Sequence, residues 1–254
     1  MKITLATFII LSSLISEAQI PADSLEKYSY PIIGVNSYVF VGTCFFIKND
    51  NKLFLITAKH IILGCDSANK KIEPYPNNFI IGCAAKPENS INIDVKAYQK
   101  SHECDGLDIY VYPVDDKYYN LYNSVEKFLI PSLDKWKTIE VFAYPKSTYN
   151  TKSEDLIIPD KAEHENIPEQ SFDFEPDRDK DDKIDTLHGK ITIPSKVNIR
   201  HGYSGAPLFL QDKISGTWRL FGVMVAGENP KRDSRSAIFY VDIKYVMAEI
   251  ERLH

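Results

Sequence analysis

Gly202-Tyr203-Ser204-Gly205-Ala206-Pro207 is the stretch of this sequence that decides the fold. It sets one serine among glycines, so the chain can turn sharply and leave the serine side chain free. Backbone N–H groups on such a turn face the same side as the hydroxyl. Nucleophilic attack on an acyl group requires both features, because the carbonyl oxygen becomes negative as the new bond forms. The stretch therefore indicates a nucleophile at Ser204.

The order of the partner residues narrows the architecture. A histidine closes the segment Leu55-Ile56-Thr57-Ala58-Lys59-His60, and Asp108 follows it by 48 residues. An α/β-hydrolase runs serine, acid, histidine, but His254 is the one histidine after Ser204, and Ala206 stands where that fold needs glycine. A subtilisin-like protease runs aspartate, histidine, serine. The order found here, histidine, aspartate, serine, is that of the chymotrypsin fold.

On these residues the chain resembles the chymotrypsin/trypsin superfamily of serine endopeptidases, in particular its bacterial trypsin-like members. TAKH is similar to the family's TAAH box, DIYV to its DIAL-type strand, and GYSGAP to GDSGGP. The resemblance extends over most of residues 35–252, but residues 146–188 do not align. It implies an all-β fold of two six-stranded antiparallel Greek-key barrels followed by a C-terminal α-helix. The first barrel is expected within residues 19–115 and the second within 135–254.

Residue patterns predict most of the elements. Two β-branched and aromatic runs, Tyr38–Ile47 and Leu53–Ala58, are joined by Asn49-Asp50-Asn51, which favours a hairpin that delivers His60. Further strands are predicted at Phe79–Cys83, Ile91–Ala97, Leu107–Tyr112, Ile139–Tyr144, Gly189–Ile193, Pro207–Leu210, Trp218–Ala226 and Ala237–Val241. Asp115–Asp134 is expected to link the barrels. After Asp242 as N-cap, apolar residues at steps of three or four predict the final helix.

The resemblance also implies roles for the site residues. His60 would act as general base and Asp108 would fix its tautomer, while the N–H groups of Gly202 and Ser204 would form an oxyanion hole. Asp105 competes with Asp108 for the acid, although the Ile-Tyr-Val strand after Asp108 favours the latter. Tyr203 stands where the animal digestive enzymes carry an aspartate that pairs with a freed N-terminal amine. Activation by such an ion pair is therefore not expected.

Substrate-binding residues follow from the same alignment. One wall of the primary pocket would hold Asn198, Ile199 and Arg200, and the other Val225, Ala226 and Gly227. Asn198 is neutral where trypsin has an acidic pocket floor, so a strict preference for arginine or lysine is not expected. Arg200 and His201 instead suggest acidic substrate side chains.

Composition sets wider limits. The chain has 254 residues, 44% of them hydrophobic, which suits a large all-β unit. Residues 1–18 have a positive start, an apolar run of about a dozen residues and small residues at Ser16 and Ala18, as in a secretory signal cleaved before Gln19. The alternative, a membrane anchor, needs about 18 or more apolar residues. The mature chain would keep its formal net charge of −5, which argues against nucleic acid and anionic membranes as partners.

Four cysteines, Cys44, Cys65, Cys83 and Cys104, suggest two disulfides in an exported chain, with three possible pairings. The resemblance implies a bridge from Cys44 to Cys65. Neither a bound metal nor a cofactor is expected. His102-Glu103-Cys104 with Cys83 lacks regular ligand spacing, and the calcium-loop pattern that starts at Asp177 has Asp182 and His188 where glycine and glutamate are essential. Residues 146–188 are therefore predicted to form a solvated acidic loop.

The sequence thus predicts an exported, secreted or periplasmic, monomeric serine endopeptidase whose partner is a protein or peptide substrate. Two alternatives stay open. One is a peptide-binding module without catalysis on the same fold, and the other is an esterase that uses the same triad, because the acyl chemistry is shared.

Overall fold

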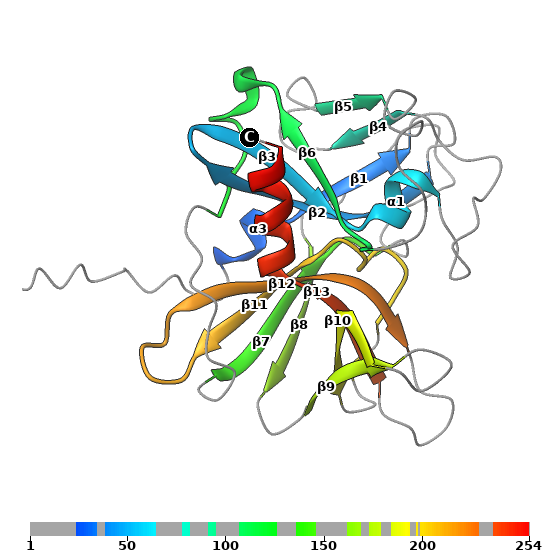
Figure 1. Cartoon of the computed structure of the whole chain (residues 1–254), viewed down its shortest axis with the longest axis vertical. Coiled ribbons are helices and arrows are strands. Elements are labelled where there is room, and N and C mark those ends of the chain that lie inside the picture. Colours follow the sequence, from blue (N-terminus) through cyan, green and yellow to red (C-terminus); the bar gives the residue numbers. More distant parts are fainter. Residues whose placement is uncertain are drawn as a thin grey trace, which may run out of the picture.

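The computed structural model contains two antiparallel β-sheets, one above the other in Figure 1, and a C-terminal helix that lies where they meet. It describes residues 24–34, 39–64, 78–81, 91–94, 107–125, 136–145, 162–168, 173–178, 184–193, 197, 199–228 and 236–253. The proposed signal segment, residues 1–18, lies outside these ranges. No helix among the described residues is long and apolar enough to cross a membrane.

The first sheet has six strands in the order β5-β4-β1-β2-β3-β6. Their bounds are β1 Tyr30–Gly34, β2 Val39–Asn49, β3 Lys52–Thr57, β4 Asn78–Ile81, β5 Ile91–Asp94 and β6 Tyr110–Val114. The turn between β2 and β3 places Asp50 and Asn51 at positive φ, which these short polar residues tolerate better than most. This hairpin delivers His60, as the sequence predicted, and His60 lies in a short helix that the sequence did not predict, α1, Lys59–Leu63.

The second sheet has the strand order β8-β7-β11-β12-β13-β10-β9. Its strands are β7 Trp136–Ala143, β8 Glu163–Pro168, β9 Asp173–Arg178, β10 Ile184–Ile193, β11 Pro207–Asp212, β12 Trp218–Glu228 and β13 Ser236–Asp242. The two edge strands, β8 and β9, are consecutive in the chain, with residues 169–172 between them. So short a connection keeps the two edges close together, which requires the sheet to curl into a barrel.

The two sheets share one topology. With β8 and β9 counted as one interrupted second strand, every neighbour pair of the first sheet recurs in the second: 1–2, 1–4, 2–3, 3–6 and 4–5. The second sheet adds the pair 5–6, which joins β12 to β13. The expected fold class, two antiparallel six-stranded barrels with a C-terminal helix, is confirmed, the seventh described strand arising from the interruption.

The expectation of a solvated acidic loop at residues 146–188 is wrong. Its described residues form β8, β9 and the start of β10 instead. β8 pairs with β7, and Ile167 is fully buried in the core of the second barrel. The alternation that marks a strand is hidden here because acidic side chains occupy positions that face inward. Asp177 and Arg178, which the sequence placed in this loop, belong to β9 and pair with β10.

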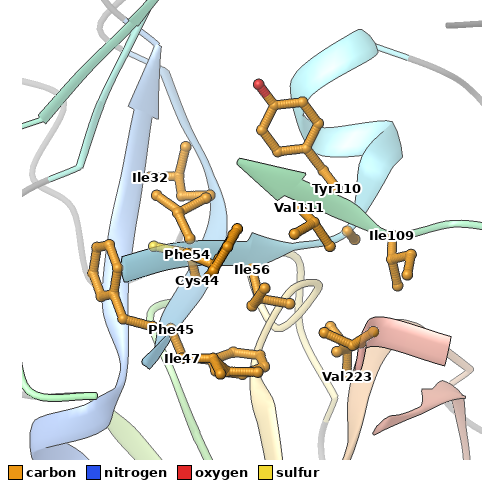
Figure 2. Packing of buried hydrophobic residues seen from close by; sticks show 14 of the residues in the cluster. Ile32, Cys44, Phe45, Ile47, Phe54, Ile56, Ile109, Tyr110, Val111 and Val223 are labelled. Carbon is orange, nitrogen blue, oxygen red and sulfur yellow. The ribbon is translucent and has the colours of Figure 1, made fainter. Parts of the chain in front are cut away.

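Helix α3, Ile243–Arg252, begins where the Asp242 carboxylate accepts the N–H of Lys244. Its buried residues, Ile243, Val246 and Ile250, belong to the same apolar cluster as the interior of the first barrel, part of which Figure 2 shows. The helix also packs against β12 and β13 of the second barrel. It therefore fastens the two barrels to each other. Two short 3₁₀ turns, η2 Glu26–Tyr28 and η4 Asp116–Tyr118, complete the described elements.

Cys44 does not form the bridge that the resemblance implied. It is a free thiol, fully buried within β2 among the side chains of the first apolar cluster (Figure 2). Burial raises the pKa of this thiol well above its ordinary value, since the charged thiolate is poorly solvated there. Cys44 therefore acts as a small apolar core residue. Cys65, Cys83 and Cys104 lie outside the described residues.

Candidate active site

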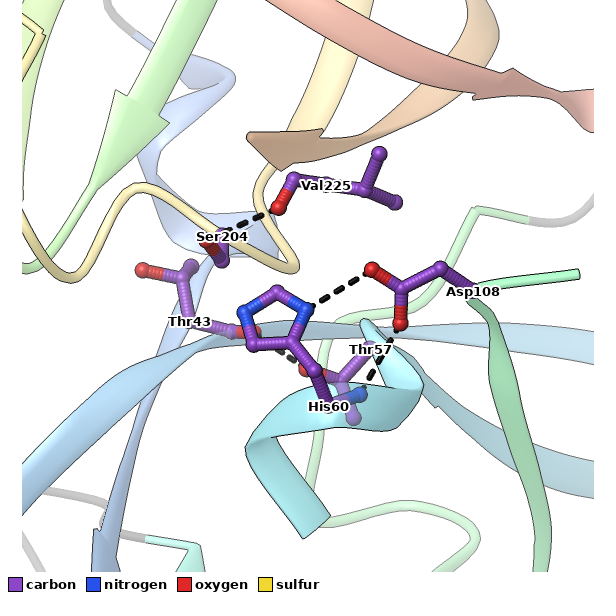
Figure 3. A network of polar contacts seen from close by, with 6 residues as sticks. All are labelled: Thr43, Thr57, His60, Asp108, Ser204 and Val225. Carbon is purple, nitrogen blue, oxygen red and sulfur yellow. Dashed lines mark hydrogen bonds and ion pairs between the residues drawn. The ribbon is translucent and has the colours of Figure 1, made fainter. Parts of the chain in front are cut away.

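Three separate segments place the predicted triad residues at the junction of the barrels. His60 lies in α1, directly after β3, and Asp108 immediately precedes β6, which pairs with β3. Ser204 comes from the second barrel, on the turn between β10 and β11. In the view of Figure 3 the imidazole ring of His60 lies between Asp108 and Ser204.

The carboxylate of Asp108 makes two contacts with His60, one with the ring and one with the backbone N–H. The Nδ1 atom of the ring lies 2.7 Å from Oδ2 of Asp108, and the backbone N–H of His60 donates to Oδ1 at 2.9 Å. A carboxylate accepts hydrogen bonds, so Nδ1 must carry the proton in this arrangement. The other ring nitrogen, Nε2, is then left as an acceptor. Asp105, the competing acid, lies outside the described residues.

Ser204 is half-buried, and its hydroxyl donates to the backbone carbonyl of Val225 at 3.1 Å. Within the described residues this is the one hydrogen bond of Ser204 Oγ, so the hydroxyl does not donate to His60 Nε2 in this structure. A rotation about the Cα–Cβ bond separates the two orientations, and side chains change between staggered rotamers readily at partly exposed positions.

The turn around Ser204 has two N–H groups that find no acceptor among the described residues. Those of Tyr203, Gly205 and Ala206 donate to carbonyls at 3.3, 2.7 and 3.0 Å, respectively. By contrast, the N–H groups of Gly202 and Ser204 donate to no group among the described residues. Gly202 has φ +105°, a conformation open to glycine. These two donors are the pair that the sequence predicted as an oxyanion hole, and they stand beside the serine hydroxyl.

Residues of the first barrel hold this turn, and sequence reasoning missed them. Thr43 donates from its backbone to Ser204 O at 2.9 Å and from Oγ1 to Gly202 O at 2.8 Å. Thr57 donates from Oγ1 to Thr43 O at 2.7 Å. Gly205, at φ +84°, packs so tightly on this pair that an added Cβ would lie 1.9 Å from Thr43 O. Only glycine fits at Gly205, and a lone threonine within a strand gives no sequence signal of such a role.

Residues of β8 hold the turn from the other barrel. Oε1 of Glu163 accepts from Arg200 Nη1 at 3.0 Å, and Oε2 accepts from the Tyr203 hydroxyl at 3.4 Å. The same hydroxyl lies 3.5 Å from Glu165 Oε1, so its single proton is shared between the two carboxylates. Burial, and then the charges of Glu165 and Glu163, raise the pKa of the Tyr203 phenol far above its ordinary value, so it stays protonated. Sequence analysis missed both glutamates because they fall in the segment taken for a loop.

The residues predicted to bind substrate divide between buried and exposed positions. Ile199 and Val225 are buried, whereas Arg200, Ala226 and Gly227 are exposed, and Asn198 lies outside the described residues. An added Cβ on Gly227 would lie 2.2 Å from Ile199 Cγ2, so the two expected walls are in contact at this point. The guanidinium of Arg200 already pairs with Glu163. This pairing leaves Arg200 with less positive charge to offer a substrate, and the expected preference for acidic side chains stays a prediction.

Neither a metal cluster nor a sequence relative adds to this site. Among the described residues, no group of three or more His, Cys, Asp or Glu side chains could hold a metal ion. No known protein-family model matches the chain, and no curated protein matches its sequence.

Proposed function

We propose that this chain is a serine endopeptidase in which Ser204 is the nucleophile, His60 the general base and Asp108 the acid that orients His60. The proposal rests on two features of the site that occur together. An imidazole with its Nδ1 proton fixed by a carboxylate stands near a serine whose turn carries two N–H groups that have no acceptor in the described part of the chain. Each feature alone occurs in proteins without catalysis, but acyl transfer needs them together.

The reaction would begin when the hydroxyl of Ser204 turns from Val225 O toward His60 Nε2. Oγ attacks the carbonyl carbon of the substrate as its proton passes to Nε2, and the carbonyl oxygen takes the negative charge. The N–H groups of Gly202 and Ser204 would stabilise that charge, and losing one such donor typically costs about 3 kcal/mol of barrier.

Collapse of the tetrahedral intermediate breaks the C–N bond, and the proton held on Nε2 passes to the leaving amine. A water molecule, deprotonated in turn by His60, then attacks the acyl-enzyme and releases Ser204 and the carboxylic acid product. Asp108 stays ionised and stabilises the imidazolium at both steps. Neither step requires a metal ion or a cofactor.

Labelling with a fluorophosphonate tests the proposal, because the probe phosphonylates an activated serine. We expect Ser204 to be labelled, and Ser204→Ala and His60→Ala to abolish both labelling and peptide cleavage in folded protein. Ser215→Ala is the matched control, since Ser215 lies exposed in the turn between β11 and β12. Folded wild-type protein that stays unlabelled between about pH 6 and pH 9 would instead favour the peptide-binding module.

The orientation of Ser204 toward Val225 is the observation that keeps the binding module as a second candidate.

Paired amide and ester substrates with the same acyl group distinguish the endopeptidase from the remaining alternative, the esterase. An endopeptidase cleaves both, whereas an esterase leaves the amide intact.

We also propose that the protein is exported and that its mature form begins at Gln19. The support is the apolar segment near the start of the sequence. Mass spectrometry of protein recovered from the medium or cell envelope tests this, and mature protein that retained Met1 would contradict it.

A further inference from the structure

The turn that carries Ser204 is held from two sides, by Thr43 of the first barrel and by Glu163 of the second. The carboxylate of Glu163 accepts from Arg200 with one oxygen and from Tyr203 with the other. These two residues precede and follow Gly202, whose N–H is one of the two donors that have no acceptor within the described ranges. A single side chain on β8 thus braces both ends of the segment that aims the Gly202 N–H.

We infer that Glu163 is a positioning residue for the two N–H groups that stabilise the oxyanion, an inference that rests on the proposed function. Glu163 acts through Arg200 and Tyr203 and does not itself contact the reacting atoms. Glycine adopts positive and negative φ about equally well, so the local chain does not determine the direction of the Gly202 N–H. Contacts from outside the turn must determine it.

The two hydrogen-bond partners of Glu163 differ in how deeply they are buried. Tyr203 is 1% exposed, so its ring is fixed by the core of the second barrel, and its hydroxyl stays a donor. The side chains of Arg200 and Glu163 are 42% and 30% exposed. An ion pair that exposed adds little to overall stability. Loss of the Glu163 carboxylate should therefore disturb the turn more than the fold.

Glu163→Gln tests the inference, because it keeps the shape of the side chain and removes its charge. Glu249→Gln is the matched control, since Glu249 pairs with Arg252 on α3, far from the turn in sequence and on another element. Three quantities are compared: the fluorophosphonate labelling rate of Ser204, kcat and KM for p-nitrophenyl acetate, and hydrogen–deuterium exchange of residues 201–207.

For Glu163→Gln we expect labelling and kcat to fall about 10- to 100-fold with KM unchanged, a loss somewhat smaller than that of a whole oxyanion donor. Exchange of the Tyr203 and Ala206 amides, which donate within the turn, should speed up. The midpoint of thermal unfolding should not fall below that of Glu249→Gln, because losing the Glu163 charge also removes its repulsion by Glu165. Equal labelling and equal exchange in the two variants would overturn the inference.

The exchange measurement separates this inference from the proposed function. If wild-type protein is not labelled, the proposed function fails, and exchange alone then decides whether Glu163 holds the turn. Tyr203→Phe supplies a second variant should Glu163→Gln not fold. It removes one donor and should slow labelling severalfold. The free-energy loss in the double variant should be smaller than the sum of the two single losses, because both changes break the contact between Glu163 and Tyr203. The inference would be contradicted if Ser204 of Tyr203→Phe were labelled at the wild-type rate. It would also be contradicted if the losses of labelling rate in the double variant were additive.

Discussion

Asp108 holds His60 at two points, with one carboxylate oxygen on the ring nitrogen Nδ1 and the other on the backbone N–H of the same residue. That N–H lies in the first turn of α1, where helical N–H groups have no partner within the helix. Ala58, the N-cap of α1, has no side chain that can accept it. Asp108 therefore supplies the cap of α1 from the start of β6, and this fixes the ring and the backbone that carries it together.

Asp108→Asn should keep the fold but lower kcat about 10⁴-fold, the loss found for the equivalent change in a related triad. The asparagine oxygen can still accept the His60 backbone N–H, which turns its NH₂ group toward Nδ1. The ring must then accept at Nδ1 and carry its proton on Nε2, where it cannot take the proton of Ser204. Kinetics on an activated ester, with circular dichroism to check the fold, measure both effects.

Asp105→Asn is the control for that change. It stands three residues away in the sequence, before Gly106, and should leave kcat within about tenfold of the wild-type value. If the two losses came out reversed, the assignment of the acid would be wrong, although Ser204 and His60 could keep their roles.

Thr43→Val should destabilise the protein and slow acylation. The side chain of Thr43 is fully buried, donates to Gly202 O and accepts the N–H of Tyr144 at 3.0 Å. Valine has the same shape but no hydroxyl, so each buried group that loses its bond costs about 1–3 kcal/mol of unfolding free energy. Urea unfolding measures this cost. Thr43→Ser keeps the hydroxyl and should lose only about 1 kcal/mol for the methyl group, so equal losses in the two variants would argue against the hydrogen bonds.

Cys44 should resist alkylation in the folded protein and react once the protein is unfolded. The thiolate is the reactive form, and burial raises the pKa of this thiol, so little thiolate exists at neutral pH. Iodoacetamide treatment with and without guanidinium, followed by mass spectrometry of the peptide that contains Cys44, checks this. Rapid modification of Cys44 in native protein would show that β2 opens readily.

Much of the fold was predictable because strong local signals coincide with its elements. The run before Asn49-Asp50-Asn51 and the run after it form β2 and β3, and the capped periodic pattern after Asp242 forms α3. β8 was missed because burial inside a barrel depends on partners distant in the sequence. Glu163 and Glu165 face Tyr203 and Arg200, and no local pattern records those partners.

The residues of the candidate site also form two groups, those that the sequence identifies and those that it does not. His60, Asp108 and Ser204 stand in short boxes whose residue types are unusual together, so the sequence identifies them. Thr43 and Glu163 are ordinary residues whose importance comes from hydrogen bonds to the turn around Ser204. Sequence separation hides such contacts, since Thr43 and Gly202 are 159 residues apart.

Glu165→Gln should stabilise the protein at neutral pH and lose this advantage in acid. Burial and the neighbouring Glu163 raise the pKa of Glu165 above its ordinary value of 4.5, while Tyr203, His164 and Arg200 oppose the shift. A carboxyl with a raised pKa favours folding only while it is protonated. Its contribution is therefore complete below the ordinary pKa and is lost as the pH rises through the raised one.

Glutamine does not titrate, so the difference in melting temperature between variant and wild type should be small near pH 4 and should grow toward pH 7. Glu165 is only half-buried, and solvent screening keeps the gain to a few degrees at most. Differential scanning fluorimetry across that range measures it, with Glu249→Gln as the control because Glu249 faces Arg252 and not a second carboxylate. A gain for Glu165→Gln that was constant with pH would mean that the pKa of Glu165 is not raised in the folded protein, either by burial or by Glu163.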